Sequence, residues 1–318
     1  MSELNTILSV VHDCNNVRDL GDIIVREGMY KFFVDDVWVG VVSSKDVQAI
    51  QAISDAQKAP LFAISSSSRK ITFSEWCNTR EKRSAAMASF LSQLREANTC
   101  EPLSKWRDEL YLVGGDASAS DGVFFELERA AAEVFGVRTY GAHINGITVS
   151  DTGEVRMWIG RRSISKQKWP GMLDQIAAGG IGNGVSIWES MVKECDEEGS
   201  IPSELSRKAK YAGTIQYFTR TDIGMQPETQ FVFDLVLPDE FVPTPKDGEV
   251  DSFYLWTLDE VIDRIRRNQF KPNCAMCIVD FLIRHGYLTP ENEPDYLEIV
   301  ENLHCSLGFP APKSFTAL

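Results

Sequence analysis

The sequence predicts an α/β protein in two parts, with a mixed sheet between helices in the second part. Three observations lead to this prediction. The chain has 318 residues, a length that suits two domains better than one compact core. A loop rich in glycine, serine and aspartate, "GGDASASDG" at residues 114–122, is the best boundary candidate. After residue 138, strand and helix patterns alternate in an order that favours a mixed sheet covered by helices.

The expected N-terminal domain covers residues 1–122 and is a small α+β unit. Residues 29–43 are typical of a hairpin, because apolar and aromatic runs flank an acidic pair at the turn. Residues 74–98 carry apolar side chains four positions apart, the spacing of a helix. Both kinds of element are therefore expected in this domain.

The expected second domain covers residues 123–318. We expect a helix at 124–136, "FFELERAAAEVFG", that ends at Gly136. A tight turn at "DTGE" joins the first two expected strands, and the C-terminal part from residue 272 begins as a helix. The expected strands are 138–150, 154–163, 211–221, 228–238 and 252–257, and a helix follows at 258–268.

The charge and composition of the chain exclude some classes of binding partner. The net charge of −14 and the pI of about 4.8 give the chain no general attraction to nucleic acids or anionic membranes. No apolar run reaches the roughly 20 residues of a membrane span. The N-terminus lacks a signal-peptide pattern, and the seven cysteines are scattered, so we expect reduced thiols and a cytoplasmic location. The expected partner is a small molecule bound by a monomer or homodimer.

A second helix is expected within "AGGIGNGVSIWESMVKECDEEGSI", residues 178–201. Ser186 and Glu189 fit the capping box that starts a helix, with the Glu189 side chain used by the cap. Gly199 fits the left-handed residue that ends one. The spacing of four residues places three apolar side chains on one buried stripe: Ile187, Met191 and Cys195.

Three glutamates share another face of this helix. Glu194, Glu197 and Glu198 lie three and four positions apart, where like charges destabilise a helix by a few tenths of a kcal/mol per pair. A solvated acidic face is the plain interpretation. The glycine-rich loop in front favours a site instead, because it lets backbone groups approach an ion or a phosphate. Mg²⁺ takes carboxylate oxygens, so ligation would replace the repulsion.

This segment resembles a Nudix box, whose pattern is G-x5-E-x7-R-E-U-x-E-E-x-G-U, where U is aliphatic. With Gly179 at the first glycine, the three metal-binding glutamates of the pattern fall on Glu194, Glu197 and Glu198. Cys195 takes an aliphatic position as a mild change. Three positions clearly depart from the pattern: Val185 replaces its first glutamate, Lys193 its arginine and Ser200 its last glycine.

The resemblance extends along the chain through "LERAAAEVFGV", "YGAHINGI", "WIGRRS", "WPGMLDQIAAGGI" and "MQPETQFVFDLVLPDEF". Together these segments resemble a Nudix subfamily whose extra N-terminal domain is also found joined to thiamine pyrophosphokinase. The resemblance implies a Nudix α/β/α sandwich and metal-dependent hydrolysis of a diphosphate bond. It points to thiamine diphosphate, or its oxo and oxy analogues, cut to the monophosphate plus phosphate.

Three alternatives stay open at this point. The substrate could be a nucleoside diphosphate derivative. The fold is shared with isopentenyl diphosphate isomerases, although Cys195 on the apolar stripe is badly placed for their chemistry. The departures at Val185 and Lys193 also fit a non-catalytic diphosphate-binding module with a degenerate box.

The resemblance assigns roles within the box. Glu194, Glu197 and Glu198 would hold Mg²⁺ or Mn²⁺, with a backbone carbonyl near Ala178 or Gly179 completing the shell. Glu197 or Glu198 would engage the attacking water. Lys193 would orient the glutamates. A second acid from outside the box would serve as base or ligand, with Glu249 the first candidate and Glu228 the second.

Substrate contacts are expected around the box. Arg161 and Arg162 are consecutive on a strand, so they face opposite sides and one could clamp a phosphate. Gly179 and Gly180 would let the backbone approach the diphosphate, and Trp169 in its loop could stack on a planar ring. The remaining candidates are weaker: Lys166 and Lys168 as cations, His143 as a packed histidine, and Cys274 with Cys277 as buried thiols rather than zinc ligands.

Overall fold

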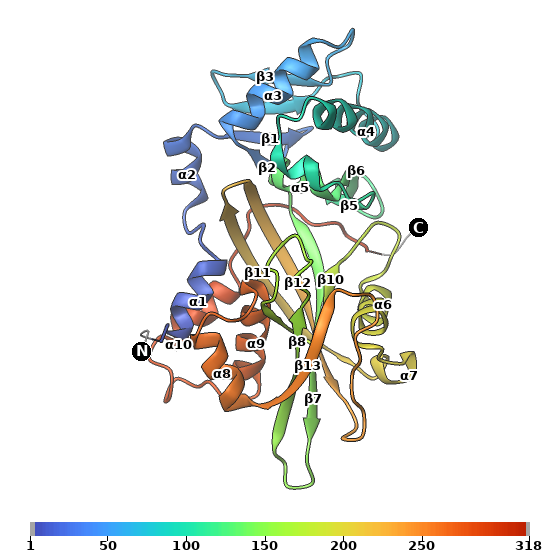
Figure 1. Ribbon diagram of the computed structural model, residues 1–318. Coiled ribbons are helices and arrows are strands. Elements are labelled where there is room, and N and C mark those ends of the chain that lie inside the picture. The colour runs from blue at the N-terminus through green and yellow to red at the C-terminus, as the bar shows by residue number, and fades with distance from the viewer. Residues whose placement is uncertain (1–3, 316–318) are drawn as a thin grey trace.

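The computed structural model describes residues 4–315, and its N-terminal half is built on a four-stranded sheet (Figure 1). The strand order is β2-β1-β4-β3, with β1 and β4 parallel and the other neighbours antiparallel. The predicted hairpin is confirmed as β1 and β2. The elements of this half are α2 (Leu20–Glu27), β1 (Tyr30–Val34), β2 (Val37–Val42), α3 (Ser44–Asp55), β3 (Phe62–Ser65), β4 (Lys70–Phe73) and α4 (Arg80–Glu96).

The predicted helix at 74–98 is confirmed as α4, but it begins at Arg80. The hydroxyl of Thr79 accepts from the backbone N–H of Lys82 and caps the first turn. The helix packs Phe90 and Leu94 fully into the core of this half. The apolar spacing therefore identified the buried face correctly, and the cap set the start.

The second half holds a mixed seven-stranded sheet of order β11-β12-β7-β8-β13, with β10 beside β7 and β9 beside β8. β12 and β7 are parallel, and the other pairs are antiparallel. This confirms the mixed sheet. Its strands are β7 (Thr139–Val149), β8 (Val155–Arg162), β9 (Leu173–Asp174), β10 (Ala177–Gly180), β11 (Lys210–Thr221), β12 (Gly224–Val236) and β13 (Val250–Thr257).

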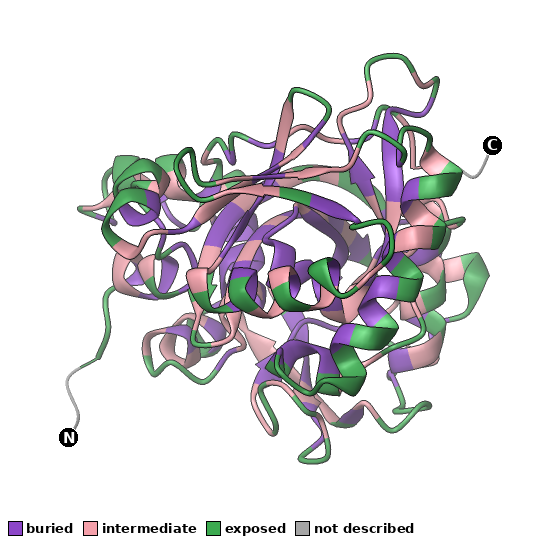
Figure 2. Ribbon diagram, turned by 90° about the horizontal axis from the view of Figure 1, so that it is seen from above, coloured by how far each residue is buried: buried purple, intermediate pink, exposed green. Residues whose placement is uncertain are grey.

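Helices cover both faces of this sheet, which gives the expected α/β/α sandwich (Figure 1). α6 (Ile187–Gly199) and α7 (Ser203–Ser206) lie on one face, and the core between α6 and the sheet includes Met191 and Cys195. The other face is covered by α1 (Ile7–Cys14), α8 (Leu258–Arg266), α9 (Pro272–Arg284) and α10 (Tyr296–Leu303). Figure 2 shows the buried segments gathered in the interior of the molecule and the exposed ones around its edges.

The predicted helix at 124–136 is wrong in its first part. Residues Val123–Glu128 form strand β6, which pairs with β5 (Leu110–Gly114). A short 3-10 turn and the one-turn helix α5 (Ala132–Phe135) follow, and Gly136 ends it in the left-handed conformation as expected. The run Val123–Phe125 is rich in residues that favour strands, and pairing with β5 decides its structure over the helical spacing.

The loop at residues 114–122 connects β5 to β6 and so lies inside a hairpin. The division of the chain after residue 122 stays a prediction. α5 lies against both halves: the carbonyl of Glu133 would be 2.3 Å from a Cβ on Gly224 in β12, and Gly40 of β2 approaches Phe135 equally closely. This segment therefore joins the two sheets.

Each chain end lies against the opposite half. α1, at the N-terminal end, packs against α9 and α10 in the second half, where Ile7 and Val11 are fully buried. The tail after α10 returns to the first half, where the Phe309 ring meets Trp38 at 5.1 Å between centroids. Pro312 fills the space that a side chain at Gly114 would need. The two halves are thus connected at both ends of the chain (Figure 1).

Candidate active site at the acidic helix

Helix α6 begins as the sequence predicts, but only half of its capping box forms. The hydroxyl of Ser186 accepts from the backbone N–H of Glu189 at 3.1 Å. The carboxylate of Glu189 does not reach back to the cap. It accepts from Arg207 at 2.9 Å instead, because an ion pair with a neighbouring guanidinium competes with the backbone amide.

The end of α6 differs from the expectation. Gly199 is the last helical residue, and Ser200 takes the left-handed conformation with a φ of 51°. The N–H of Ser200 donates to the carbonyl of Asp196, and its hydroxyl donates to the carbonyl of Thr244 at 2.9 Å. The left-handed residue is thus the one that stands at the glycine position of the Nudix pattern, and a serine occupies it at some conformational cost.

The buried stripe of α6 sets the orientation of its glutamates. Met191 and Cys195 are fully buried against the sheet, and Ile187 packs at the edge of the same core. With this stripe inward, Glu198 faces β10, where it accepts from the amide of Ala178 at 2.8 Å. Ala178 therefore contacts the glutamates of α6 through its backbone N–H.

Gly179 makes room for Glu194. A Cβ on Gly179 would lie 2.1 Å from the carboxyl carbon of Glu194, so every other residue would displace this carboxylate. Glu194 and Glu198 thus lie against consecutive residues of β10. The close approach explains physically why a glycine stands at the start of the box.

Two of the glutamates are withdrawn from solvent, Glu198 being buried and Glu194 partly buried. Burial raises the pKa of Glu198 well above its usual value, and the charges of Asp174 and Glu194 raise it further. Burial also raises the pKa of Glu194; Lys193 opposes this, while Glu197 and Glu249 add to it. Within residues 4–315, Glu198 forms no salt bridge with a lysine or arginine. The fold therefore disfavours the ionised forms of both glutamates and, among the described residues, gives Glu198 no cationic partner.

Glu197 and Glu249 are held by lysines. Lys193 donates to Glu197 at 2.6 Å and lies 3.6 Å from Glu194. Lys166 forms an ion pair with Glu249. Burial alone would raise the pKa of Glu249, but Lys166, Arg162 and Arg129 lower it below its usual value.

These lysines keep the acids apart. In the described part of the chain, no three His, Cys, Asp or Glu side chains converge closely enough to hold a metal ion. The donor set nevertheless fits a hard divalent cation: three carboxylates on one helix, two of them withdrawn from solvent, with a fourth, Glu249, near enough to influence the pKa of both. Releasing Glu197 from Lys193 would bring the third carboxylate into the set.

Both predicted arginines are engaged with protein groups. Arg162 is buried and donates to Asp174 at 2.7 Å and to the carbonyls of Lys168 and Trp169. Arg161 donates to the carbonyl of Gly171 at 2.9 Å and lies over the Tyr254 ring. Arg162 therefore shapes the loop of residues 166–172. A phosphate contact by either arginine stays a prediction.

The other candidates are spread around the site. Trp169 is 44% exposed and has a positive φ of 53°, so its ring is free to meet a ligand. Glu228 accepts from Gln230 at 2.9 Å and from the Tyr217 hydroxyl. His143 is buried and bonded to Gln175, and burial lowers its pKa to about 4. Cys274 and Cys277 are buried free thiols, as expected.

Sequence reasoning missed residues that the N-terminal half brings to the site. The hydroxyl of Tyr111, on β5, lies 2.2 Å from where a Cβ on Gly180 would be. The guanidinium of Arg129 lies 3.6 Å from the same point. Arg129 belongs to "LERAAAEVFGV", a segment already quoted for the resemblance. That signal could have identified it, but the expectation of a helix there hid its role.

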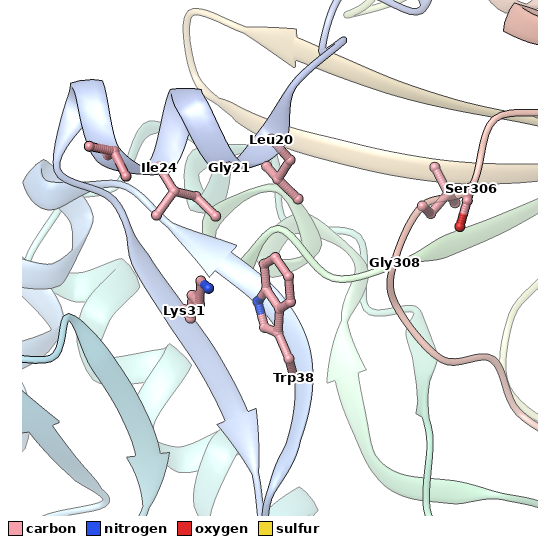
Figure 3. Close-up of a pocket in the computed structure, with 9 residues that line it drawn as sticks. Leu20, Gly21, Ile24, Lys31, Trp38, Ser306 and Gly308 are labelled. Carbon is pink, nitrogen blue, oxygen red and sulfur yellow. The ribbon is translucent and has the colours of Figure 1, made fainter.

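A hollow of about 430 Å³ lies elsewhere, between α2 and the C-terminal tail (Figure 3). Leu20, Ile24 and Leu307 line it, with Trp38 and Lys31 at its side. The Lys31 ammonium lies 4.7 Å from the centroid of the Trp38 ring. None of its lining residues belongs to the acidic helix or to the predicted site.

The sequence matches two family models. One, described as a domain of unknown function (DUF4743), covers residues 6–139. The other, described as the NUDIX domain, covers residues 140–274. Across the described residues, no helix combines the length and apolar character that crossing a membrane requires.

Among curated relatives, Nudix hydrolase 24, chloroplastic, of Arabidopsis thaliana is 34% identical over 95% of this chain and 78% of its own length. Nudix hydrolase 20, chloroplastic, of the same plant is 33% identical with the same coverage. An uncharacterized protein of Saccharomyces cerevisiae is 44% identical over 64% of this chain, and the match spans 63% of that protein.

Among solved structures, an Ap4A hydrolase of C. elegans matches 47% of this chain and 99% of its own, with 14% identity and a TM-score of 0.36. The NUDIX family model covers the acidic helix, and two of the relatives are Nudix hydrolases. The chain, with its α/β/α sandwich and its three glutamates on α6, belongs to the Nudix hydrolase family.

Proposed function

We propose that this protein is a metal-dependent hydrolase that cuts the diphosphate bond of thiamine diphosphate, or of its oxo and oxy analogues, to the monophosphate plus phosphate. Membership of the Nudix hydrolase family supports the cleavage of a diphosphate bond. The thiamine compounds, and the link to the subfamily associated with thiamine pyrophosphokinase, rest on the sequence resemblance. The N-terminal half, matched by a model of unknown function, is part of that resemblance.

The observation that carries the proposal is the buried carboxylate of Glu198 next to the partly buried carboxylate of Glu194 on α6. A buried ionised carboxylate is costly unless a cation or several hydrogen bonds compensate it. Glu198 has one bond from the Ala178 amide, and its pKa is raised by burial. Burial of both side chains favours their protonated forms, and a bound cation would reverse that preference. A divalent cation provides the largest compensation in the smallest space.

Nudix hydrolases generally use Mg²⁺ or Mn²⁺, and the residues here fit such an ion. Glu194, Glu197 and Glu198 would hold it, and when bound it would neutralise the diphosphate and lower the pKa of a bound water. Lys193 would orient the glutamates through its contacts with Glu197 and Glu194. The lowered pKa of Glu249 makes it a better cation ligand than a general base, since a base acts best with a pKa near the working pH.

The test is phosphate release in Mg²⁺ from a panel of diphosphates. The panel contains thiamine diphosphate, its oxo and oxy analogues, ADP-ribose, NADH, a dinucleoside polyphosphate and isopentenyl diphosphate. A phosphatase is added in parallel to reveal cuts that yield only a monophosphate. Preferential turnover of the thiamine compounds, lost in Glu197→Gln, is the expected result.

Two other results would change the proposal. Glutamate-dependent turnover of a nucleotide alone would keep the hydrolase and remove the thiamine assignment. No turnover by a folded protein that binds Mg²⁺ would favour a diphosphate-binding module. Cys195 is fully buried, which leaves it unable to act as the cysteine of an isopentenyl diphosphate isomerase.

A cytoplasmic location belongs to the same proposal. The two plant relatives carry the word chloroplastic in their names, so an organelle is the contrary outcome. Fluorescence microscopy of the tagged chain distinguishes the two. Size-exclusion chromatography with light scattering distinguishes the proposed monomer from the homodimer.

A further inference from the structure

A segment of the N-terminal half lies directly along the glycine-rich loop that precedes α6. The Tyr111 hydroxyl fills the space beside Gly180, and the amide of Asn183 donates to the carbonyl of Leu110 at 2.8 Å. The Glu109 carboxylate would lie 3.1 Å from a Cβ on Gly182. The glycines of this loop therefore admit the N-terminal half, and residues 109–111 form one wall of the site.

Arg129 stands on this wall. Its backbone N–H donates to the carbonyl of Glu109 at 2.8 Å, which fixes the start of the side chain. The guanidinium donates to the Glu109 carboxylate at 2.7 Å and lies 5.6 Å from the centroid of the Tyr111 ring. The side chain is 40% exposed, so part of its fork faces solvent beside the glycine loop.

Arg129 differs from the other cations near the site. Arg162 is buried in its ion pair with Asp174, and Lys193 and Lys166 hold acids of the expected metal set. The partner of Arg129 is Glu109, which lies outside that set and is 33% exposed. The positive charge of Arg129 still reaches the acidic cluster, because it lowers the pKa of Glu249. Because its acidic partner is partly exposed and lies outside the expected metal set, an anion can compete for this guanidinium.

A second observation points to a ligand at this wall. Gly141 pairs with Gly180 across β7 and β10, and the side-chain carbonyl oxygen of Gln230 lies 2.1 Å from where a Cβ on Gly141 would be. That oxygen is buried and has no donor, while the amide nitrogen of Gln230 donates to Tyr217 and Glu228. Such an acceptor is costly when left unpaired. A hydroxyl or amino group of a ligand would satisfy it.

We propose that Arg129 is a substrate-binding residue, supplied by the N-terminal half, that takes a phosphate of the diphosphate substrate on its free N–H groups. The inference rests on the proposed function and deepens it. Glu109 and Tyr111 position the guanidinium while the site is empty. Substrate then competes with Glu109 for it, since a planar fork binds phosphate and carboxylate with the same geometry.

The test compares two variants that break the same ion pair. Arg129→Met removes the phosphate contact, so KM for thiamine diphosphate is expected to rise about ten- to a hundredfold, the range of a hydrogen bond to a charged group. Glu109→Gln removes the competitor and leaves the guanidinium, so KM is expected to fall or stay the same. A purely structural ion pair predicts that both variants raise KM. A rise in both variants, or in neither, overturns the inference.

Controls keep the test decisive. Arg207→Met breaks the exposed pair with Glu189 on α6 and is expected to leave KM unchanged. Circular dichroism and Mn²⁺ binding show whether each variant is folded with its acidic cluster intact. If Arg129→Met does not fold, Arg129→Lys keeps the charge without the fork, and an intermediate rise in KM is expected. An unchanged KM in Arg129→Lys would contradict a phosphate contact that depends on the planar guanidinium.

A binding measurement separates failure of this inference from failure of the proposed function. If the wild-type protein turns over no diphosphate, the hydrolase assignment fails. The inference is then judged by titrating methylenediphosphonate in Mg²⁺. Tighter binding by the wild-type protein than by Arg129→Met supports a diphosphate site on this wall, and equal binding excludes it.

Discussion

Two acids in the second half of the molecule have the same charge and opposite surroundings. Asp234, on β12, accepts from Arg284 at 2.6 Å, from His285 and from Asn145, and these bonds outweigh burial to lower its pKa. Glu198, on α6, has only the Ala178 amide, and its pKa is raised well above the usual value. The fold therefore favours the charged form of Asp234 and disfavours the charged form of Glu198.

The difference indicates what each acid is for. A paired carboxylate that ties β12 to α9 stabilises the fold, whereas an uncompensated one makes folding less favourable and is retained where something else will bind it. Buried polar groups connect the two regions, from Asp174 through Cys274, His143 and Gln175 to Asn145, which donates to Asp234. Four substitutions test the contrast, from the largest expected effect to the smallest.

Replacing Glu198 by Gln should separate activity from stability. We expect kcat to fall at least a hundredfold, because a bound cation contributes several kcal/mol to transition-state stabilisation. Thermal stability without metal should stay the same or rise, since the burial of a charge is relieved. Steady-state kinetics and calorimetry in EDTA measure both. A clear drop in the melting temperature would show that Glu198 is structural, like Asp234.

Acid should destabilise the protein through His143. Burial lowers its pKa, Lys271 lowers it further and Gln175 and Asp174 oppose them, so it moves from 6.5 to about 4. Above pH 6.5 both folded and unfolded states hold a neutral imidazole. Below it the unfolded state gains a proton first, so about 3 kcal/mol of stability is lost as pH falls toward 4.

Urea unfolding between pH 4 and 7 measures this loss, and His143→Gln should flatten the profile. His304→Gln, which changes an exposed ring, serves as the control and should keep the wild-type slope. Equal slopes in all three proteins would contradict a neutral buried His143.

Breaking the compensated pair should destabilise the fold without touching the chemistry. Arg284→Met leaves Asp234 with His285 and Asn145 as its side-chain partners. It also removes the arginine partner of Asp280, so we expect a loss of about 2 kcal/mol. Arg267→Met breaks an exposed i,i+4 pair with Asp263 and should cost under about 0.5 kcal/mol. Activity per folded molecule should be unchanged in both. A loss of activity in Arg284→Met would link the two acids functionally.

The smallest effect concerns the end of α6. Ser200→Gly should stabilise the protein by about 0.5 kcal/mol, because relief of the left-handed strain exceeds the added freedom of the unfolded chain. Gly199→Ala, one residue earlier on helical backbone, should be close to neutral, with its Cβ 3.3 Å from the Ile201 side chain. Chemical denaturation measures the free energy of unfolding of both variants. A Gly199→Ala variant more stable than Ser200→Gly would contradict the assignment of Ser200 as the left-handed residue.

The sequence predicted the elements whose local pattern matches their burial. The hairpin at 29–43, helix α4 and the stripe of Met191 and Cys195 follow from spacing alone. The box glutamates were found because the pattern is short and contiguous. Strand β6 was mistaken for a helix, because the loop between it and its partner β5 was interpreted as a domain boundary rather than as the turn of a hairpin.

The wall of the site was missed for the same reason. Tyr111 and Arg129 reach Gly180 only through the packing of one half on the other, and no spacing rule brings them together. Likewise the sequence gives Lys166 no partner, whereas the structure pairs it with Glu249. Partners distant in sequence decide which charges remain available.

Two segments near the ends of the chain, α1 and the tail after α10, limit the movement of one half relative to the other. α1 packs on the second half, and the tail around Phe309 contacts the first half. A hinge motion that separated the halves would therefore expose the apolar side chains of one of these segments. The contacts of Tyr111 and Glu109 with the glycine loop before α6 are therefore expected to keep their spacing, because the two halves are tied together at two separate places.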